Sequence, residues 1–216
     1  MPRALLLDLG GTAIGSGVEA MADLAEREPA LREVCARRGP LGPVADPEWD
    51  EMITGGITER EYWHRRGAEF GAALGRPGWT VQEFMHLLFG QPGLRPGARR
   101  LAADARAAGV PVGVLTNDLR AFHGEDAVSE HPFLAEFDVL VDGSDIGVLK
   151  PDPRAYAIAA RRLGLPPGEI VFVDDMPGNV DGARRAGMVA VLLDYADPDA
   201  AFDTARAALG LGRRAA

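Results

Sequence analysis

The sequence is poor in cysteine and in long apolar runs. Its 216 residues include one cysteine, Cys35, so no disulfide can form within the chain, a composition typical of a reducing compartment. We expect Cys35 to be a small buried or half-buried residue, because no catalytic signature surrounds it. No stretch is long and apolar enough to span a bilayer, and the short apolar run before Asp8 predicts no signal peptide. We therefore predict a cytoplasmic protein with no membrane partner.

Positive charge is also scarce. The chain carries 23 Lys and Arg against 32 Asp and Glu, a net charge of −9 at pH 7, and it has no basic run. This balance argues against binding to the phosphate backbone of a nucleic acid. Lysine is almost absent, since Lys150 is the only lysine among the 23 basic residues. In a chain so biased toward arginine, we expect this lysine to lie where a guanidinium would not serve.

The sequence does contain a regular alternation of apolar runs and helical patterns. Apolar residues make up 47% and charged residues 25% of the chain, as in folded globular proteins. The alternation predicts an α/β fold with a doubly wound, parallel, Rossmann-like sheet. The strands are predicted at residues 4–7, 110–115, 170–173, 189–193 and, from a weaker pattern, 137–141. The helices between them are predicted at residues 98–108, 153–163, 179–186 and 200–209.

Residues 15–94, called the insertion below, break this alternation. They show helical patterns over 18–38, 58–74 and 80–89, separated by Gly- and Pro-rich joints, and no convincing strand pattern. We therefore predict an α/β core formed by residues 1–14 and 95–216, interrupted by a helical insertion after the first strand.

Polar side chains stand where the predicted strands end. Asp8 follows the first strand, Thr116 the second, and the pair Asp174 and Asp175 a later one. Ligands of open parallel sheets bind beyond the carboxyl ends of the strands, so we expect these side chains to meet, with Lys150 beside them. Clustered carboxylates suit Mg²⁺, and an ammonium beside them suits a phosphoryl group. An aspartate in such a site can act as the nucleophile of phosphoryl transfer.

Four motifs, in series from residue 4 to about 193, resemble those of the haloacid dehalogenase (HAD) superfamily. They are Asp8-Leu9-Gly10-Gly11-Thr12, Thr116-Asn117, Gly147-Val148-Leu149-Lys150-Pro151-Asp152-Pro153, and Asp174-Asp175 with Gly178-Asn179. The insertion resembles the helical cap of the first subfamily. The Asp-Asp form of the fourth motif and the stretch from Gly55 to Trp63 resemble the branch of sugar-phosphate phosphatases and the phosphatase domain of soluble epoxide hydrolase.

The resemblance implies a role for each matched residue. Asp8 attacks phosphorus and becomes an aspartyl-phosphate, Thr116 and the backbone at Asn117 hold the transferring group, and Lys150 stabilises it. The implied Mg²⁺ ligands are Asp8, the carbonyl of Gly10, Asp174 and Asp175. The expected substrate is a small phosphorylated metabolite, with sugar phosphates as the first candidate, and the expected state is a monomer or a homodimer.

The first motif departs from the family pattern at Gly10. Family phosphatases carry there an aspartate that protonates the leaving group and later activates water, and losing such an acid/base slows a reaction by on the order of 10²–10⁴. We predict a slower phosphatase, helped by water or by another carboxylate such as Asp118. A binder of phosphorylated ligands without turnover and a dehalogenase-like hydrolase remain alternatives. A phosphonatase would need a lysine in the insertion, where the sequence has none.

Two further patterns have competing interpretations. Asp8 to Thr12 also resembles the phosphate loop of actin-like sugar kinases, but those kinases have a second such loop, which this chain lacks. In the insertion, Trp63 is expected to be buried on an amphipathic helix, and its neighbours His64, Arg65 and Arg66 are expected to face solvent.

Overall fold

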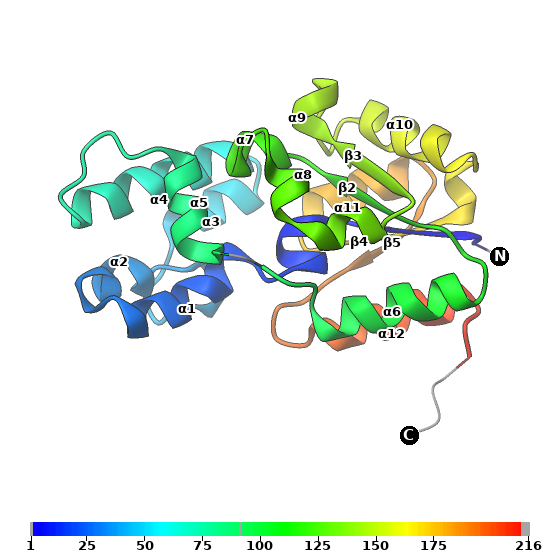
Figure 1. Cartoon of the computed structure of the whole chain (residues 1–216), viewed down its shortest axis with the longest axis horizontal. Helices are drawn as coiled ribbons and strands as arrows, with labels where there is room; N and C mark the ends of the chain where they lie inside the picture. The colour runs from blue at the N-terminus through cyan, green and yellow to red at the C-terminus, as the bar shows by residue number, and fades with distance from the viewer. Residues whose placement is uncertain (1, 91, 213–216) are drawn as a thin grey trace.

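The computed structural model describes residues 2–90 and 92–212, and it places the insertion beside the core (Figure 1). The core contains a five-stranded sheet in the order β3-β2-β1-β4-β5, and every neighbouring pair is parallel. The strands are β1 (Ala4–Leu7), β2 (Val112–Thr116), β3 (Val139–Asp142), β4 (Ile170–Asp174) and β5 (Val189–Leu192). The predicted fold class is confirmed, and all five predicted strands are present with small shifts of their ends.

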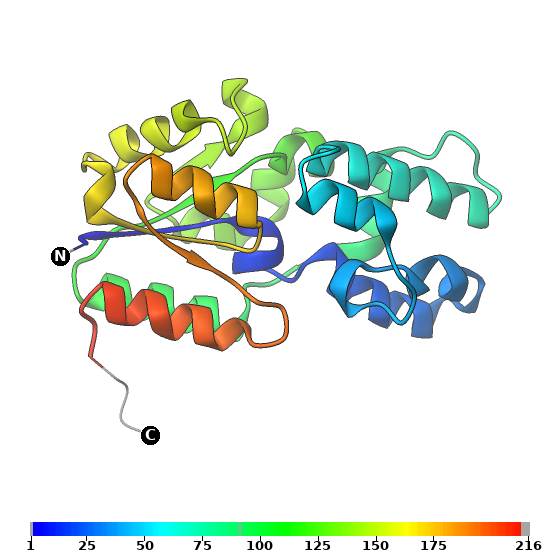
Figure 2. The same ribbon diagram turned by 180° about the vertical axis from the view of Figure 1, so that it is seen from behind.

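Helices cover both faces of the sheet. Successive strand residues point to opposite faces, so each strand packs side chains against both helical layers. In β1, Leu5 and Leu7 pack on one side, and Ala4 and Leu6 pack on the other. The first side is covered by α6 (Pro96–Ala107) and α12 (Pro198–Ala208). The second is covered by α10 (Pro153–Leu163) and α11 (Pro177–Arg185), and Figure 2 shows the same two layers from behind. The central strands β2, β1 and β4 are therefore buried between the two helical layers, whereas β5 at one side of the sheet is partly exposed.

Three short helices follow strands β2 and β3 along the chain. They are α7 (Leu119–His123), α8 (Ala127–Glu130) and α9 (Gly143–Ile146). Between β1 and the insertion, the chain makes an irregular turn, η1 (Leu9–Ala13), in which Gly10 and Gly11 have non-helical dihedrals. Helix α7 packs against the insertion through Phe122, which joins the hydrophobic cluster of the insertion. The segment that follows β2 thus borders both the core and the insertion.

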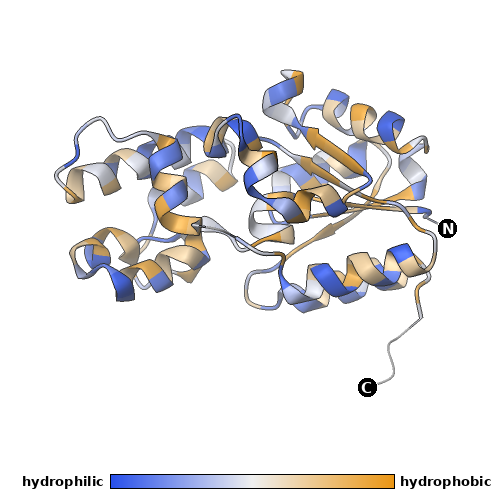
Figure 3. Cartoon of the chain, viewed as in Figure 1, coloured by the Kyte–Doolittle hydropathy of each residue, from blue (hydrophilic) through white to orange (hydrophobic). Residues whose placement is uncertain are grey.

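The insertion folds into helices around its own hydrophobic cluster. The helices are α1 (Gly17–Arg27), α2 (Arg32–Ala36), α3 (Pro47–Ile53), α4 (Glu59–Ala73) and α5 (Val81–Phe89). Figure 3 shows apolar residues on the inward sides of these helices and along the core strands. This cluster supports the proposed boundary between the core and the insertion at residues 15–94. Residues 1, 91 and 213–216 of the proposed ranges lie outside the described residues.

The prediction of one helical stretch over 18–38 is wrong in detail. Helix α1 ends at Arg27, and Glu28 adopts φ −126° and ψ 85° before Pro29. Proline has no N–H to donate and disfavours helical backbone at the residue before it, so the helix stops there. Helix α3 was not predicted; it begins after Asp46, whose side chain accepts a hydrogen bond from the Trp49 N–H.

The two chain crossings between core and insertion meet at Arg95. Its backbone N–H donates to the Ala13 carbonyl at 2.8 Å, and its guanidinium donates to the carbonyls of Ile14 and Gly11 at 3.2 and 3.0 Å. The same side chain pairs with Glu19 of α1. One arginine therefore ties the outgoing and returning segments together beside the first motif.

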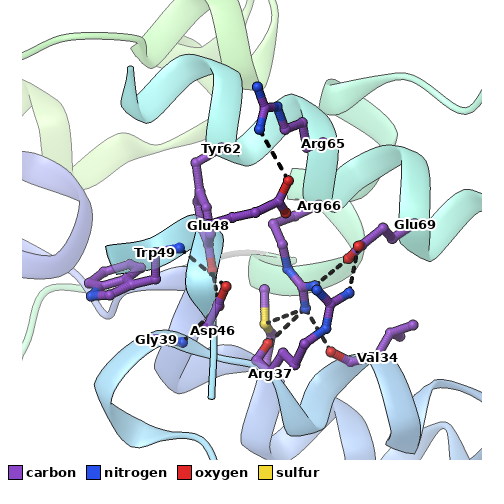
Figure 4. Close-up of polar contacts among 11 residues, drawn as sticks. Val34, Arg37, Gly39, Asp46, Glu48, Trp49, Tyr62, Arg65, Arg66 and Glu69 are labelled. Atoms are coloured by element: carbon purple, nitrogen blue, oxygen red, sulfur yellow. Dashed lines mark hydrogen bonds and ion pairs between the residues drawn. The ribbon is translucent and has the colours of Figure 1, made fainter. Parts of the chain in front are cut away.

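A buried polar network joins the helices of the insertion (Figure 4). Arg66 is 0% exposed, and its guanidinium donates to the carbonyls of Val34 and Arg37 at 2.6 and 2.7 Å and pairs with Glu69. The expectation that Arg66 faces solvent is therefore wrong, whereas His64 and Arg65 are exposed. An arginine at this position satisfies backbone carbonyls that the end of α2 leaves unpaired.

Asp46 is the second centre of this network. Its carboxylate accepts from the N–H of Gly39 at 3.0 Å, the N–H of Trp49 at 3.2 Å and the hydroxyl of Tyr62 at 2.8 Å. The residue is 4% exposed. These bonds link three segments that are not neighbours in sequence, so the insertion is held by polar contacts as well as by its apolar cluster.

Cys35 is buried in the insertion, as expected, and burial raises the pKa of its thiol to about 11. A thiol with so high a pKa stays protonated and is a poor nucleophile. Within residues 2–90 and 92–212, no helix combines the length and the apolar character needed to cross a membrane.

Candidate active site

The parallel register brings the polar strand ends to one edge of the sheet. Leu7 of β1 pairs with Val114 of β2 and with Val173 of β4. Asp8, Thr116 and Asp174 therefore lie close to the same level of three adjacent strands. Asp8, Thr116 and Asp174 are 7%, 7% and 0% exposed. The predicted gathering of these residues is what the structure shows.

Lys150 lies at the centre of the site, before helix α10. Its Nζ is 2.5 Å from Oδ1 of Asp8 and 2.6 Å from Oδ2 of Asp174. The lysine is only 4% exposed. Burial alone would lower the pKa of this ammonium, but the charges of Asp174 and Asp8 outweigh burial and raise it. Lys150 is therefore a permanent cation between two carboxylates.

Asn117 holds this lysine in place from the end of β2. Its side-chain nitrogen donates to the Lys150 carbonyl at 3.2 Å, and its side-chain oxygen accepts from the Lys150 N–H at 2.7 Å. The two bonds join segments 33 residues apart. The side chain of Asn117 is thus occupied in positioning Lys150, and its predicted contact with substrate would come from its backbone.

Asp174 is fixed by hydrogen bonds at both of its oxygens. Oδ1 accepts from the N–H of Met176 at 2.8 Å and from the side chain of Asn179 at 3.1 Å, and Oδ2 accepts from Lys150. Asn179 belongs to the fourth motif, but no role for it was predicted. Because both of its oxygens already accept hydrogen bonds, Asp174 is suited to position the Lys150 ammonium and is less available than Asp175 as a metal ligand.

Asp175 is the more available member of the pair. Its carboxylate accepts from the Thr12 hydroxyl at 3.1 Å and from the hydroxyl of Tyr195. Burial and the neighbouring charge of Asp174 raise the pKa of Asp175 to about 7. Gly11, at φ 77°, lies against this carboxylate, which a Cβ at that position would overlap. The glycine is required both by its backbone conformation and by this close approach.

The three carboxylates form a donor set that fits a divalent cation. Asp8, Asp174 and Asp175 each offer an oxygen within 4.8 Å of the others. Burial raises the pKa of the Asp8 carboxyl; Lys150 lowers it, and the charges of Asp174 and Asp175 raise it further. Three carboxylates and one ammonium sum to a charge of −2, so a hard divalent cation such as Mg²⁺ would balance the cluster and keep Asp8 ionised.

Gly10 adopts φ −68° and ψ 132°, a conformation open to any residue. A Cβ at this position would meet no heavy atom within 4 Å. The glycine is therefore not required by the backbone or by packing. Its carbonyl keeps the capacity to bind a metal, whereas no side chain here can transfer a proton.

A pocket lies between the core and the insertion, above Asp8. The pocket opens to solvent, and both the core and the insertion line it. The core contributes Asp8, Thr116, Asn117 and Lys150 to its lining. The contribution of the insertion is mostly apolar: Trp49, Met52, Trp63, Met85 and Phe89. Trp63 is buried, as expected, and it also faces this pocket.

Two carboxylates flank the pocket near Asp8. Asp118, proposed from the sequence as a substitute acid, is paired with Arg60 of the insertion, whose Nε lies 2.9 Å from Oδ1. Glu59, which was not predicted as a site residue, lines the pocket from the first turn of α4. The capping box of Thr58 and Glu61, which fixes where this helix begins, is the sequence signal that could have placed Glu59.

Fold and site together place a buried lysine and three carboxylates at the carboxyl edge of a doubly wound sheet. The family model described as haloacid dehalogenase-like hydrolase matches residues 2–187. The chain therefore belongs to this family of hydrolases, as the motifs predicted.

Two curated relatives show how far the similarity extends. The mouse acyl-CoA dehydrogenase family member 10 is 29% identical over 217 residues, which cover 96% of this chain and 19% of that protein. The chain thus spans about a fifth of this relative. A phosphoserine phosphatase of Thermus thermophilus is 30% identical over 222 residues, which cover 93% of this chain and 86% of the relative.

Solved structures support the fold. The L-2-haloacid dehalogenase of Xanthobacter autotrophicus is similar with a TM-score of 0.59 at 22% identity, over 89% of this chain and 78% of that one. Dehalogenases and phosphatases of this family share their architecture, so the choice between the two reactions depends on the residues of the site.

Proposed function

We propose that this enzyme is a Mg²⁺-dependent phosphatase of small phosphorylated metabolites, acting through an aspartyl-phosphate on Asp8. The observation that carries this proposal is the buried lysine bridging Asp8 and Asp174, with Asp175 close enough to complete a metal site. A haloacid carries a single negative charge and needs no metal, whereas a phosphate dianion matches a site that holds both a cation and a lysine. The cytoplasmic location stays a prediction.

In the proposed reaction, each core residue has a distinct task. Asp8 attacks phosphorus, and the phosphoryl group moves from the substrate oxygen to a carboxylate oxygen of Asp8. The ammonium of Lys150 stabilises charge on the transferring group, and the Thr116 hydroxyl, which makes no hydrogen bond within residues 2–90 and 92–212, donates to a phosphoryl oxygen. Bound by Asp8, Asp175, Asp174 and the Gly10 carbonyl, Mg²⁺ would supply further charge neutralisation.

The lining from the insertion limits the leaving group. Among the pocket residues that the structure describes, the insertion supplies no lysine or arginine. Its aromatic and thioether side chains favour an ester whose leaving group carries apolar surface and no further anion. The sugar-phosphate prediction stays untested, and this lining ranks polyhydroxylated sugars below apolar or aromatic esters.

The test is phosphate release from a panel that contains p-nitrophenyl phosphate, a sugar phosphate, phosphoserine and a hydrophobic alkyl phosphate, with and without Mg²⁺. The control is Asp8→Asn, a near-isosteric change that removes the nucleophile. We expect release that requires Mg²⁺, disappears in the variant and is fastest for the apolar esters. Release that persists in Asp8→Asn would exclude the aspartyl-phosphate route.

Gly10 supports a second candidate, a binder of phosphorylated ligands without turnover. The open space around this residue makes Gly10→Asp a sterically clean test. A phosphatase limited by proton transfer should become faster on esters with poor leaving groups. A binder should show no phosphate release in the wild type, while it still binds inorganic phosphate with Mg²⁺ in calorimetry.

A further inference from the structure

Glu59 lies in the pocket above the nucleophile, although it belongs to the insertion. It is the first residue of α4, half-buried, and shares the pocket lining with Asp8 and Lys150. The side chain of Thr58 caps the helix by accepting from the Glu61 N–H at 3.1 Å, and this fixes the first turn. Glu59 is thereby held at the end of a 15-residue helix that points its first turn at the site.

The neighbours of Glu59 have partners, but Glu59 has none. Arg60 pairs with Asp118, and the Glu61 carboxylate accepts from Thr58 at 2.8 Å. Across residues 2–90 and 92–212, no hydrogen bond or ion pair engages the Glu59 carboxylate. It is also the only charged side chain that the described insertion residues contribute to the pocket. A half-buried carboxyl without a partner costs stability, a cost that proteins tolerate where the group serves function.

The surroundings bring the pKa of this carboxyl close to neutral pH. Burial raises the pKa of Glu59 to about 7, the charge of Asp8 adds to the rise, and Lys150 opposes it. The other charged groups that face it from the packed elements are Asp174, Asp118 and Asp175. A carboxyl with a pKa near the working pH can both give and take a proton.

Other pocket side chains are less suited to this task. The carboxylate of Asp118 is engaged by Arg60, and the hydroxyl of Tyr195 donates to Asp175. His123 also lines the pocket, but burial lowers its pKa to about 4, so at neutral pH it carries no proton to donate as an acid of matched strength. Asp175, whose pKa is also about 7, is assigned to the metal, so Glu59 is the pocket carboxyl left for proton transfer among the described residues.

We propose that Glu59 is the general acid and base of this enzyme, taking the part that the side chain missing at Gly10 plays elsewhere in the family. The proposal rests on the proposed phosphatase function. It places the proton donor on the insertion instead of on the turn after β1. The catalytic set is then complete only where the core and the insertion meet.

The two half-reactions balance with Glu59 in this role. In the first, the bond between Asp8 and phosphorus forms, the bond from phosphorus to the substrate oxygen breaks, and that oxygen takes the Glu59 proton and leaves as an alcohol. In the second, the Glu59 carboxylate takes a proton from water, whose oxygen attacks phosphorus. The bond between phosphorus and Asp8 breaks, phosphate leaves, and Glu59 is protonated again.

Glu59→Gln tests the proposal, because it keeps the shape and removes the transferable proton. The variant is assayed with p-nitrophenyl phosphate, whose leaving group needs no proton, and with an alkyl phosphate, whose leaving group does. We expect kcat for the alkyl ester to fall by on the order of 10²–10⁴. With the aryl ester, Asp8 should be phosphorylated at nearly the normal rate, and its slow hydrolysis should give a burst of one nitrophenolate per enzyme.

The pH profile supplies a readout that a merely structural role would not move. In the wild type, kcat for the alkyl ester should decline as the pH rises through the pKa of Glu59, because the acid form is lost. Glu59→Gln should lack this limb. Glu51→Gln, an exposed carboxylate of α3, is the matched control and should behave as wild type.

Rescue completes the test. Gly10→Asp in the Glu59→Gln background should restore alkyl-ester turnover, because it returns a carboxyl to the position beside Asp8. Equal losses for both esters, or no loss at all, would overturn the role of Glu59 while Mg²⁺-dependent release by the wild type upheld the proposed function. Absence of release from both esters by the folded wild type would overturn both.

Discussion

The core and the insertion meet at one pocket, but they hold their side chains there by different means. In the core, Lys150 donates hydrogen bonds to Asp8 and Asp174, and the Asn117 side chain bonds to the Lys150 backbone. Asp174 also accepts from Asn179 and from the Met176 N–H. In the insertion, the pocket side chains are held by packing: the rings of Trp63 and Tyr62 lie 5.0 Å apart, edge to face. Among the described insertion residues that line the pocket, Glu59 is the one with a charged side chain.

This difference separates two requirements of an enzyme. Chemistry at phosphorus needs charges held in fixed geometry, which hydrogen bonds with few alternatives provide. Selection of a leaving group needs a shaped apolar surface, which packed aromatic side chains provide. The core should therefore respond to substitution mainly in kcat, and the insertion mainly in KM and stability, with Glu59 as the exception.

The largest effect should come from Lys150→Arg, which keeps the charge and changes the geometry. A guanidinium is too large to place one nitrogen between two carboxylates in a site where the lysine is 4% exposed. We expect kcat/KM for p-nitrophenyl phosphate to fall by roughly 10²–10³-fold. A thermal melt of the variant should confirm that it folds. Unchanged turnover would show that the single lysine of this chain is not specifically required.

A smaller effect, on stability instead of chemistry, is expected from Asp46→Ala in the insertion. The change removes the acceptor for Gly39, Trp49 and Tyr62 and leaves buried donors unsatisfied. We expect the free energy of unfolding to fall by roughly 2–4 kcal/mol in urea titration. Asp50→Ala on the same helix is exposed and should change little. If both variants unfold alike, the buried network does not hold the insertion.

The smallest effect should follow from Arg60→Ala, which removes the ion pair between the insertion and Asp118. The arginine is 41% exposed, so solvent weakens the pair, but the carboxylate is only 5% exposed. We expect KM for the best ester to rise by about 3–10-fold, with kcat for p-nitrophenyl phosphate nearly unchanged.

Arg65→Ala is the matched control for this change, because Arg65 is exposed on the same helix and pairs with Glu48 and Glu51 inside the insertion. Arg60→Lys should recover part of the loss. A large drop in kcat for the aryl ester with Arg60→Ala would mean that the pair positions Asp8 itself, and the division of labour between core and insertion would fail.

The core could be predicted from the sequence because its signals are local. Each strand is a short apolar run, and the polar residue that ends it is carried to the sheet edge by parallel pairing alone. Asp8, Thr116 and Asp174 follow from this rule, and Lys150 from its scarcity and its place before a helix. The tasks of Asn117 and Asn179 could not be inferred, because they depend on hydrogen bonds between distant segments.

The insertion was less predictable, because its pattern specifies helices but not how they dock. Pro29 signals the end of helix α1, but the helical spacing of apolar residues continues past this proline, so one long helical stretch was predicted. Arg66 looked solvent-facing because charge on an amphipathic helix usually is, and only the tertiary structure supplies carbonyls to receive it. Glu59 belonged to a recognised stretch, but nothing local shows that its helix begins at the pocket.

Gly10 has an evolutionary consequence. Its backbone accepts any residue, and the space beside it is open. Two of the four glycine codons, GGT and GGC, differ from the aspartate codons by a single base, so from either of them one point mutation places an aspartate at this position. A lineage can therefore lose or regain that aspartate without passing through a misfolded intermediate, provided that another group carries the proton meanwhile.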